Sequence, residues 1–99
     1  MADRKPRLTA QTLQVLDALL TWPGSAGADI SRHTKLPSGT LYPILLRLED
    51  AGWLSSEWEG GNPPELGRPR RRFYRVTAEG ALAARSAAEE LRPLIWRLA

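Results

Sequence analysis

The fold is decided at residues 36–44, which read LPSGTLYPI. Leu36-Pro37 predicts a turn, because the residue before a proline is pushed out of helical geometry. Ser38 follows as the expected N-cap of a helix that Gly52 ends, since glycine adopts the left-handed conformation of a helix stop. The apolar residues of this helix fall at i, i+3, i+4 and i+7: Leu41, Ile44, Leu45 and Leu48. One face of the helix is therefore expected in the core and the other outside.

Further helices are predicted on both sides of this segment. The first follows Thr9 as its N-cap and ends at Pro23-Gly24. A short second helix is expected at about 26–34, with Asp29 near its positive end. A last helix follows Thr77, another expected N-cap, and carries apolar residues at helical spacing.

Two strands are predicted between the third and the last helix. Residues 54–58 alternate in the manner of a half-buried strand, residues 60–64 (GGNPP) break it, and a return strand runs at about 71–76. The long connection predicts a hairpin with an extended loop. The chain is thus expected to be mainly α with a small β-hairpin, in the α-α-α-β-β-α order of a winged helix-turn-helix.

Three regions are expected along the chain. Residues 1–8 contain RKPR at 4–7 and are expected to form a flexible basic arm. Residues 9–76 make up the winged helix-turn-helix DNA-binding domain. Residues 77–99 form a C-terminal dimerisation helix.

Composition excludes several classes of function. The chain has 99 residues, which favours one domain, and no cysteine, which excludes disulfides, thiolate nucleophiles and cysteine-ligated metals. His33 is the one histidine, so we expect neither a metal nor a cofactor. Asp29, Glu49 and Asp50 have no recognisable nucleophile or base beside them, which argues against an enzyme. Without an apolar run long enough for a membrane or a signal peptide, the chain is expected in the cytoplasm.

The charge distribution indicates a nucleic-acid partner. Net charge is only +3, but five of the eight residues from Arg68 to Arg75 are arginine and none is acidic. Such a loop can neutralise phosphates or enter a minor groove, while a helix start rich in hydroxyls fits the major groove. The predicted contacts to double-stranded DNA are Lys35, Ser38, Gly39, Thr40, Tyr42, Arg47, Arg68, Arg70, Arg71 and Arg72.

Each part of this interface has a plainer alternative. Ser38 can be only a cap, and the arginines can form a solvated charge run that Glu57, Glu59 and Glu65 balance across the hairpin. Arg72 lies in the strand and is expected to pair in this way as often as it contacts DNA. The arginines nearer the tip are the stronger candidates for DNA contact.

The C-terminal helix raises the question of assembly. Apolar residues crowd its last nine positions, and an apolar patch left in water usually marks an interface. A twofold dimer would place two recognition helices one DNA turn apart, roughly 34 Å. The alternative is a monomer whose tail folds back on the first helix. The residues predicted at the dimer interface are Leu13, Leu16, Leu91, Leu94, Ile95, Trp96 and Leu98.

Several segments together resemble the PadR family of bacterial transcriptional regulators. They are residues 38–45 (SGTLYPIL), 47–49 (RLE), 51–54 (AGWL), 56–58 (SEW) and 70–80 (RRRFYRVTAEG). The resemblance implies a winged helix-turn-helix homodimer, paired through its first and C-terminal helices, that represses transcription by occupying an operator. It matches Ser38, Thr40 and Tyr42 to the recognition helix and the arginines up to Arg72 to the wing.

The resemblance also bears on ligands and alternatives. Some family members bind flat aromatic ligands between paired tryptophans of the dimerisation helix, so a small aromatic effector is a possible partner, although packing is the expected role of Trp96. Two departures are a short C-terminal region and a long, arginine-rich wing. The alternative function is a winged-helix protein-interaction module, which salt-insensitive or absent duplex binding would indicate.

Overall fold

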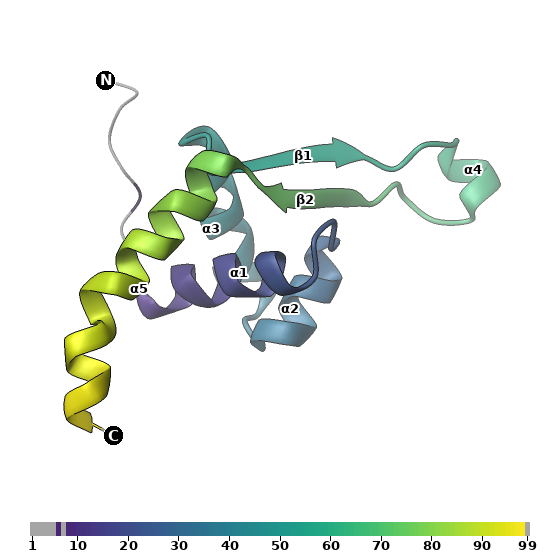
Figure 1. Ribbon diagram of the computed structural model, residues 1–99. Helices are drawn as coiled ribbons and strands as arrows, with labels where there is room; N and C mark the ends of the chain where they lie inside the picture. The colour runs from purple at the N-terminus through teal and green to yellow at the C-terminus, as the bar shows by residue number, and fades with distance from the viewer. Residues whose placement is uncertain (1–5, 7, 99) are drawn as a thin grey trace.

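A cluster of three helices carries a long hairpin on one side and a C-terminal helix on the other (Figure 1). The computed structural model describes residues 6 and 8–98; the predicted basic arm falls mostly on residues 1–5 and 7, outside this range. The elements are α1 (Ala10–Thr21), α2 (Gly27–Thr34), α3 (Ser38–Asp50), β1 (Leu54–Trp58), α4 (Pro63–Leu66), β2 (Arg72–Val76) and α5 (Ala78–Leu98). The winged helix-turn-helix order is confirmed. Within the extended loop that the sequence predicts, Pro63–Leu66 form the four-residue helix α4.

Side chains cap two helices as the sequence predicts. The Thr9 hydroxyl accepts from the Thr12 amide at 3.1 Å, and the Thr77 hydroxyl accepts from the Gly80 amide at 3.1 Å. The prediction of Ser38 as N-cap is wrong, because Pro37 occupies that position in extended geometry and α3 begins at Ser38 itself. The Pro37 carbonyl accepts the first bonds of α3, from the Thr40 amide at 3.0 Å and the Leu41 amide at 2.9 Å.

The inner face of α3 forms the centre of the core. Its four periodic residues are at most 3% exposed, which confirms the predicted buried face. They pack in one cluster with the following residues: Val15, Leu16, Leu19, Ile30, Leu36, Trp53, Leu54 and Tyr74. Burial of this face turns Tyr42 and Leu46 outward, where they are 49% and 60% exposed.

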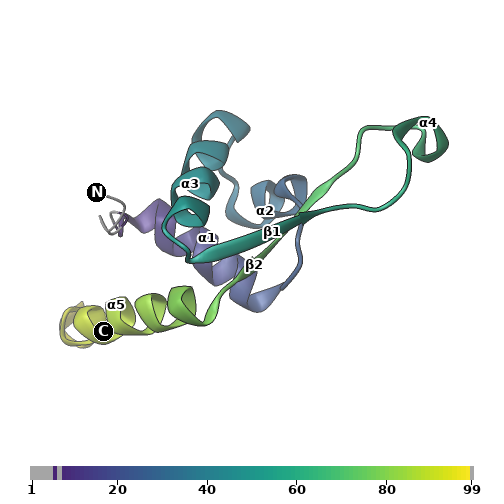
Figure 2. The ribbon, with the colours of Figure 1, turned by 90° about the horizontal axis from the view of Figure 1, so that it is seen from above.

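The hairpin is anchored at its base and free at its tip. β1 and β2 pair antiparallel, with Leu54 opposite Val76 and Trp58 opposite Arg72. The connection between α1 and α2 adds two bonds at the base: the Gly24 amide donates to the Tyr74 carbonyl, and the Tyr74 amide donates to the Ser25 carbonyl, both at 3.0 Å. Figure 2 shows the hairpin continuing past this anchor to α4, far from the helices. The base of this long wing is therefore fixed to the helical cluster.

Candidate nucleic-acid interface

The start of α3 presents its polar residues to solvent. Lys35 ends α2 in the left-handed conformation, at φ 62°, and turns the chain toward α3. Ser38 and Gly39 are exposed and Thr40 is half-buried, while Arg47 is exposed farther along the helix. Because a cap role for Ser38 is excluded, its hydroxyl is not committed to holding the helix end. Apart from the half-buried Thr40, the predicted contacts on α3 are thus exposed to solvent.

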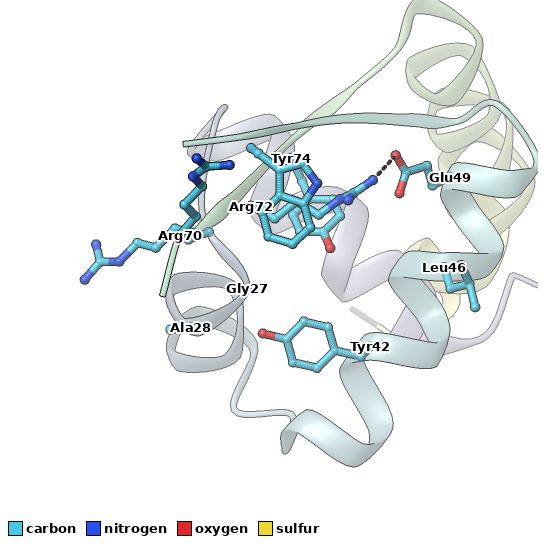
Figure 3. A pocket seen from close by; sticks show the side chains of 11 residues that line it. Gly27, Ala28, Tyr42, Leu46, Glu49, Arg70, Arg72 and Tyr74 are labelled. Carbon is cyan, nitrogen blue, oxygen red and sulfur yellow. Dashed lines mark hydrogen bonds and ion pairs between the residues drawn. The ribbon is translucent and has the colours of Figure 1, made fainter. Parts of the chain in front are cut away.

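Tyr42 lies against the N-terminal turn of α2. A Cβ atom built on the buried Gly27 would be 2.4 Å from the Tyr42 hydroxyl oxygen, so only glycine permits this approach. Figure 3 shows the ring extending from α3 toward Gly27. The sequence analysis did not identify Gly27, since nothing in the local pattern shows which side chain will approach it from another helix.

Arg72 joins the wing to α3. Its Nη2 lies 3.3 Å from Glu49 Oε2, its Nε donates to the Ser56 hydroxyl at 2.8 Å, and its guanidinium lies 4.9 Å from the centre of the Trp58 ring. The Ser56 hydroxyl also donates to Glu49. This is the pairing that the sequence left open for Arg72, although its partner lies on α3 and not across the hairpin (Figure 3). Arg72 therefore has a structural role, in which it sets the position of the wing relative to α3.

Arg68 closes the wing loop on Glu59. Its two terminal nitrogens lie 2.6 and 2.8 Å from the two carboxylate oxygens of Glu59, which also accepts from the Arg71 amide at 3.2 Å. The Arg68 guanidinium is the main cause that lowers the pKa of Glu59 to about 2, with the Arg71 amide adding to it. The Glu59 carboxylate in turn raises the pKa of Arg68. Arg68, predicted as a strong DNA contact, is thus engaged within the wing.

Arg70 and Arg71 carry uncompensated charge in the wing loop. Both side chains are exposed, and within the described residues neither has a carboxylate within 4.0 Å. The Arg70 Nε donates to the Gly61 carbonyl at 2.6 Å, which leaves its terminal nitrogens outside that bond. These two arginines are the members of the predicted wing set that form no ion pair within the described residues.

A groove brings the wing and the outward face of α3 together. Its volume is about 630 Å³, and Tyr42 and Leu46 line it from α3 while Arg70 and Arg71 line it from the wing. The N-terminal turn of α2 forms another part of the wall, through Gly27 and its neighbours. Predicted residues that are about thirty positions apart in sequence therefore face one space.

The bond between Glu59 and Arg68 has a testable pH dependence. Because folding lowers the pKa of Glu59, its stabilising effect is present above the unfolded value, near 4.5, and is lost as pH falls through about 2. In an NMR titration of the side-chain carboxyl, we expect Glu59 to titrate near 2 and to move up toward 4.5 in an Arg68→Gln variant. Identical titrations in the two proteins would show that Arg68 is not the cause.

The predicted dimer residues fall into three groups. Leu16 is 1% exposed in the core of one chain, so it has almost no surface left for a partner. Leu13 and Leu91 line a second groove, of about 470 Å³, between α1 and α5, and Leu98 is 79% exposed. The side chains of Leu94, Ile95 and Trp96 lie outside the described part of the structure.

Two other kinds of site are absent from the described residues. They contain no cluster of three or more histidine, cysteine, aspartate or glutamate side chains that could hold a metal ion.

His33 stacks on Trp22, with ring centroids 3.7 Å apart, and so joins the end of α1 to α2. None of the helices described in residues 8–98 has the length and apolar character needed to cross a bilayer.

Comparisons with known proteins agree with this geometry. The model of the family described as "Transcriptional regulator PadR-like family" matches residues 27–86, more than half of the chain. A solved PadR family regulator from Eggerthella lenta is 27% identical, with a TM-score of 0.70 over 88% of this chain and 78% of that one. No curated protein shows significant sequence similarity.

Two further solved structures share the fold. A PadR family regulator from Clostridium difficile has a TM-score of 0.73 and 23% identity, over 91% of this chain and 94% of that one. The PcaV transcriptional regulator from Streptomyces coelicolor, solved with its natural ligand, has a TM-score of 0.69 and 24% identity, over 84% of this chain. The chain spans only 55% of the length of PcaV.

Proposed function

The chain belongs to the PadR-like family of transcriptional regulators, and we propose that it represses transcription as a homodimer that occupies a palindromic operator. The family consists of DNA-binding regulators and not of enzymes. Repression by occupancy needs no residue beyond those that hold the duplex. We propose that this repression takes place in the cytoplasm, together with the chromosome.

One observation carries the proposal: Tyr42 and Leu46 on the outward side of α3 line the same groove as Arg70 and Arg71 of the wing. A helix in the major groove and a cationic wing at the neighbouring backbone or minor groove engage one stretch of duplex from one side. Phosphate contacts from Arg70 and Arg71 position the protein, and side chains at the start of α3 reach the base edges. The bonds of Arg72 to Glu49 and Ser56 hold the two parts at a fixed spacing.

The direct test is binding to the protein's own upstream promoter fragment, compared with a scrambled duplex of the same length and composition. We expect a protected, palindromic footprint and affinity that falls steeply with salt. A Thr40→Ala variant should lose discrimination between the two duplexes, because Thr40 supplies a base-edge contact and no charge. Equal binding to both duplexes by the unsubstituted protein would reject sequence-specific repression, and salt-insensitive or absent binding would favour a protein-interaction module.

The dimer is proposed on the groove between α1 and α5. Most of its lining is leucine and alanine, namely Leu13, Leu16, Leu20, Ala81, Ala84, Ala88 and Leu91. Asp17 and Arg85 are the charged residues of the lining. Leu20 is 48% and Leu91 39% exposed, and exposed apolar residues that gather in one place indicate an interface. A second copy of the chain would cover both leucines and place two copies of α3 on one face of the duplex.

A charge at Leu91 should therefore separate the protomers. We expect the unsubstituted protein to scatter light with twice the 11.0 kDa mass of one chain, and a Leu91→Glu variant to scatter as one chain. Leu82→Glu is the matched control, because Leu82 is 61% exposed on the same helix and does not line the groove. An 11.0 kDa species in the unsubstituted protein at micromolar concentration would reject the dimer.

A further inference from the structure

We propose that Gly27 is a positioning residue for DNA recognition, although it has no side chain with which to contact the duplex. Because position 27 carries no Cβ atom, the Tyr42 ring can lie against α2, and this contact fixes where the Tyr42 hydroxyl meets the duplex. The contact itself stands on the geometry of the two helices. Its effect on operator recognition rests on the proposed function.

Tyr42 approaches Gly27 more closely than any larger residue would allow. An ideal Cβ atom at position 27 would lie 2.4 Å from the Tyr42 hydroxyl oxygen, 2.9 Å from its Cζ and 3.1 Å from its Cε1. The first two distances are shorter than a Cβ atom tolerates from a non-bonded heavy atom. All three atoms belong to the outer end of the tyrosine side chain, which reaches from α3 toward Gly27 in Figure 3. A side chain at position 27 therefore excludes the observed place of the ring.

The backbone at Gly27 is held in place from both sides of the chain. Its neighbour Ala26 forms a β-bridge with Phe73 of β2. The Ala26 amide also donates to the Asp29 carboxylate at 3.3 Å, and the Ala26 carbonyl accepts from the amide of the fully buried Ile30 at 3.0 Å. These contacts join the start of α2 to the wing and to the core. A larger residue at position 27 therefore has to displace the tyrosine ring.

The Tyr42 side chain, in contrast, can change its rotamer at little cost. Tyr42 is 49% exposed, whereas Leu41 and Ile44 are 0% and 3% exposed and hold the backbone of α3 in the core. Aromatic side chains on helices adopt mainly two χ1 rotamers. Alanine at position 27 would block the one in which the ring lies against α2, and the ring would turn toward the groove that it lines together with the wing. One added methyl group thus changes the surface that faces DNA and leaves the core intact.

The place of the Tyr42 hydroxyl matters because hydrogen bonds are short and directional. A hydroxyl contributes to recognition only when its oxygen lies within about 3 Å of an acceptor on the duplex. A ring that is already held in one rotamer also loses less conformational entropy when DNA binds. Gly27 therefore affects, through Tyr42, how tightly and how selectively the promoter is bound.

NMR of the free protein tests the contact without DNA. We expect nuclear Overhauser effects between the Tyr42 ring protons and the Gly27 α-protons, and their loss between the same two backbone and ring positions in a Gly27→Ala variant. The urea midpoint should stay close to that of the unsubstituted protein, because only the ring moves and alanine is favoured over glycine in a helix. Absence of the contact in the unsubstituted protein, its persistence in Gly27→Ala, or an unfolded variant would overturn the proposal.

A double-mutant cycle then tests the effect on DNA. Gly27→Ala and Tyr42→Ala should each bind the promoter duplex about tenfold more weakly, the loss expected for one hydrogen bond. The salt slope should not change, because neither variant removes a charge. The double variant should bind no more weakly than Tyr42→Ala alone, since Gly27 acts only through the tyrosine ring.

Gly60→Ala is the matched control for the added methyl group. Gly60 is exposed, and a Cβ atom built there would have no neighbour within 4 Å. This variant should bind the promoter like the unsubstituted protein. Losses in Gly27→Ala and Gly60→Ala of the same size would show that the effect does not come from Tyr42, and would overturn the positioning role.

The outcomes separate this inference from the proposed function. Additive losses in the cycle, or unchanged promoter affinity in Gly27→Ala or Tyr42→Ala, would overturn the positioning role and leave repression by operator binding standing. A protein that shows the contact by NMR but binds no promoter duplex would contradict the proposed function, and the role of Gly27 in DNA recognition with it.

Discussion

A double variant with Arg70→Ala and Arg71→Ala is expected to bind every duplex about a hundredfold more weakly at low salt, because each charged contact to phosphate contributes roughly 1.5 kcal/mol. The plot of log affinity against log salt should also become shallower by about 1.8, since each lost phosphate contact releases about 0.9 fewer counterions. Discrimination between the promoter and a scrambled duplex should change little, because phosphate contacts carry no sequence information. Fluorescence anisotropy across a salt series measures all three quantities.

The matched control removes the same charge from another part of the molecule. Arg92 and Arg97 are both exposed on α5, and replacing both with alanine lowers the net charge as much as the wing variant does. The C-terminal end of α5 lies away from the wing, as Figure 1 shows. We expect this control to keep the salt slope of the unsubstituted protein. If the wing variant kept the same slope and affinity as the control, the wing would have no part in the mechanism.

The parts of the fold that the sequence predicts correctly are governed by local rules. The spacing of apolar residues in α3 identifies its buried face, because an apolar stripe at helical period has to meet the core. Thr9 and Thr77 are found as caps, since a cap bonds an amide only a few residues away. The prediction of Ser38 as the N-cap fails because the preceding residue, Pro37, has the extended backbone geometry of the N-cap position. The preference of serine for N-cap positions does not reveal this.

Tertiary contacts determine which arginines of the wing form ion pairs and which do not. Arg68 meets Glu59 because the wing loop folds back on itself, and Arg72 meets Glu49 across 23 positions of sequence. From the sequence, all the arginines of 68–75 have the same chemistry and differ only in expected position. The fold decides which of them are compensated: among the described residues, Arg70, Arg71 and Arg75 have no carboxylate within 4.0 Å. Of these three, Arg70 and Arg71 line the groove beside α3. Leu16 is likewise predicted at the dimer interface but is buried in the core of one chain. The sequence pattern identifies it as apolar, and only packing determines whether an apolar residue lies in the core or at an interface.

A Gly80→Ala variant is expected to lose about 3 kcal/mol of unfolding free energy, at the upper end of the usual cost of overpacking. Gly80 is buried near the start of α5, where a Cβ atom would lie 2.2 Å from the Trp53 carbonyl oxygen and 3.0 Å from Val76 Cγ1. The Trp53 carbonyl cannot move freely, because it accepts from the Thr77 amide at 2.9 Å next to the cap of α5. Relief of the contact would therefore separate α5 from the loop that joins α3 to β1.

Gly39→Ala is the matched control for this effect, because a Cβ atom at Gly39 would have no neighbour within 4 Å. Both glycines are helical, so alanine should leave Gly39 unchanged or stabilise the protein by up to about 1 kcal/mol through the unfolded chain. Urea unfolding of the two variants at one protein concentration gives the comparison, since association shifts apparent stability. Equal midpoints would mean that α5 does not pack against Trp53 as described. A lowered urea midpoint in Gly80→Ala but not in Gly39→Ala would assign the loss of stability to the contact with Trp53. Helix propensity cannot explain such a difference, because it acts on both variants in the same direction.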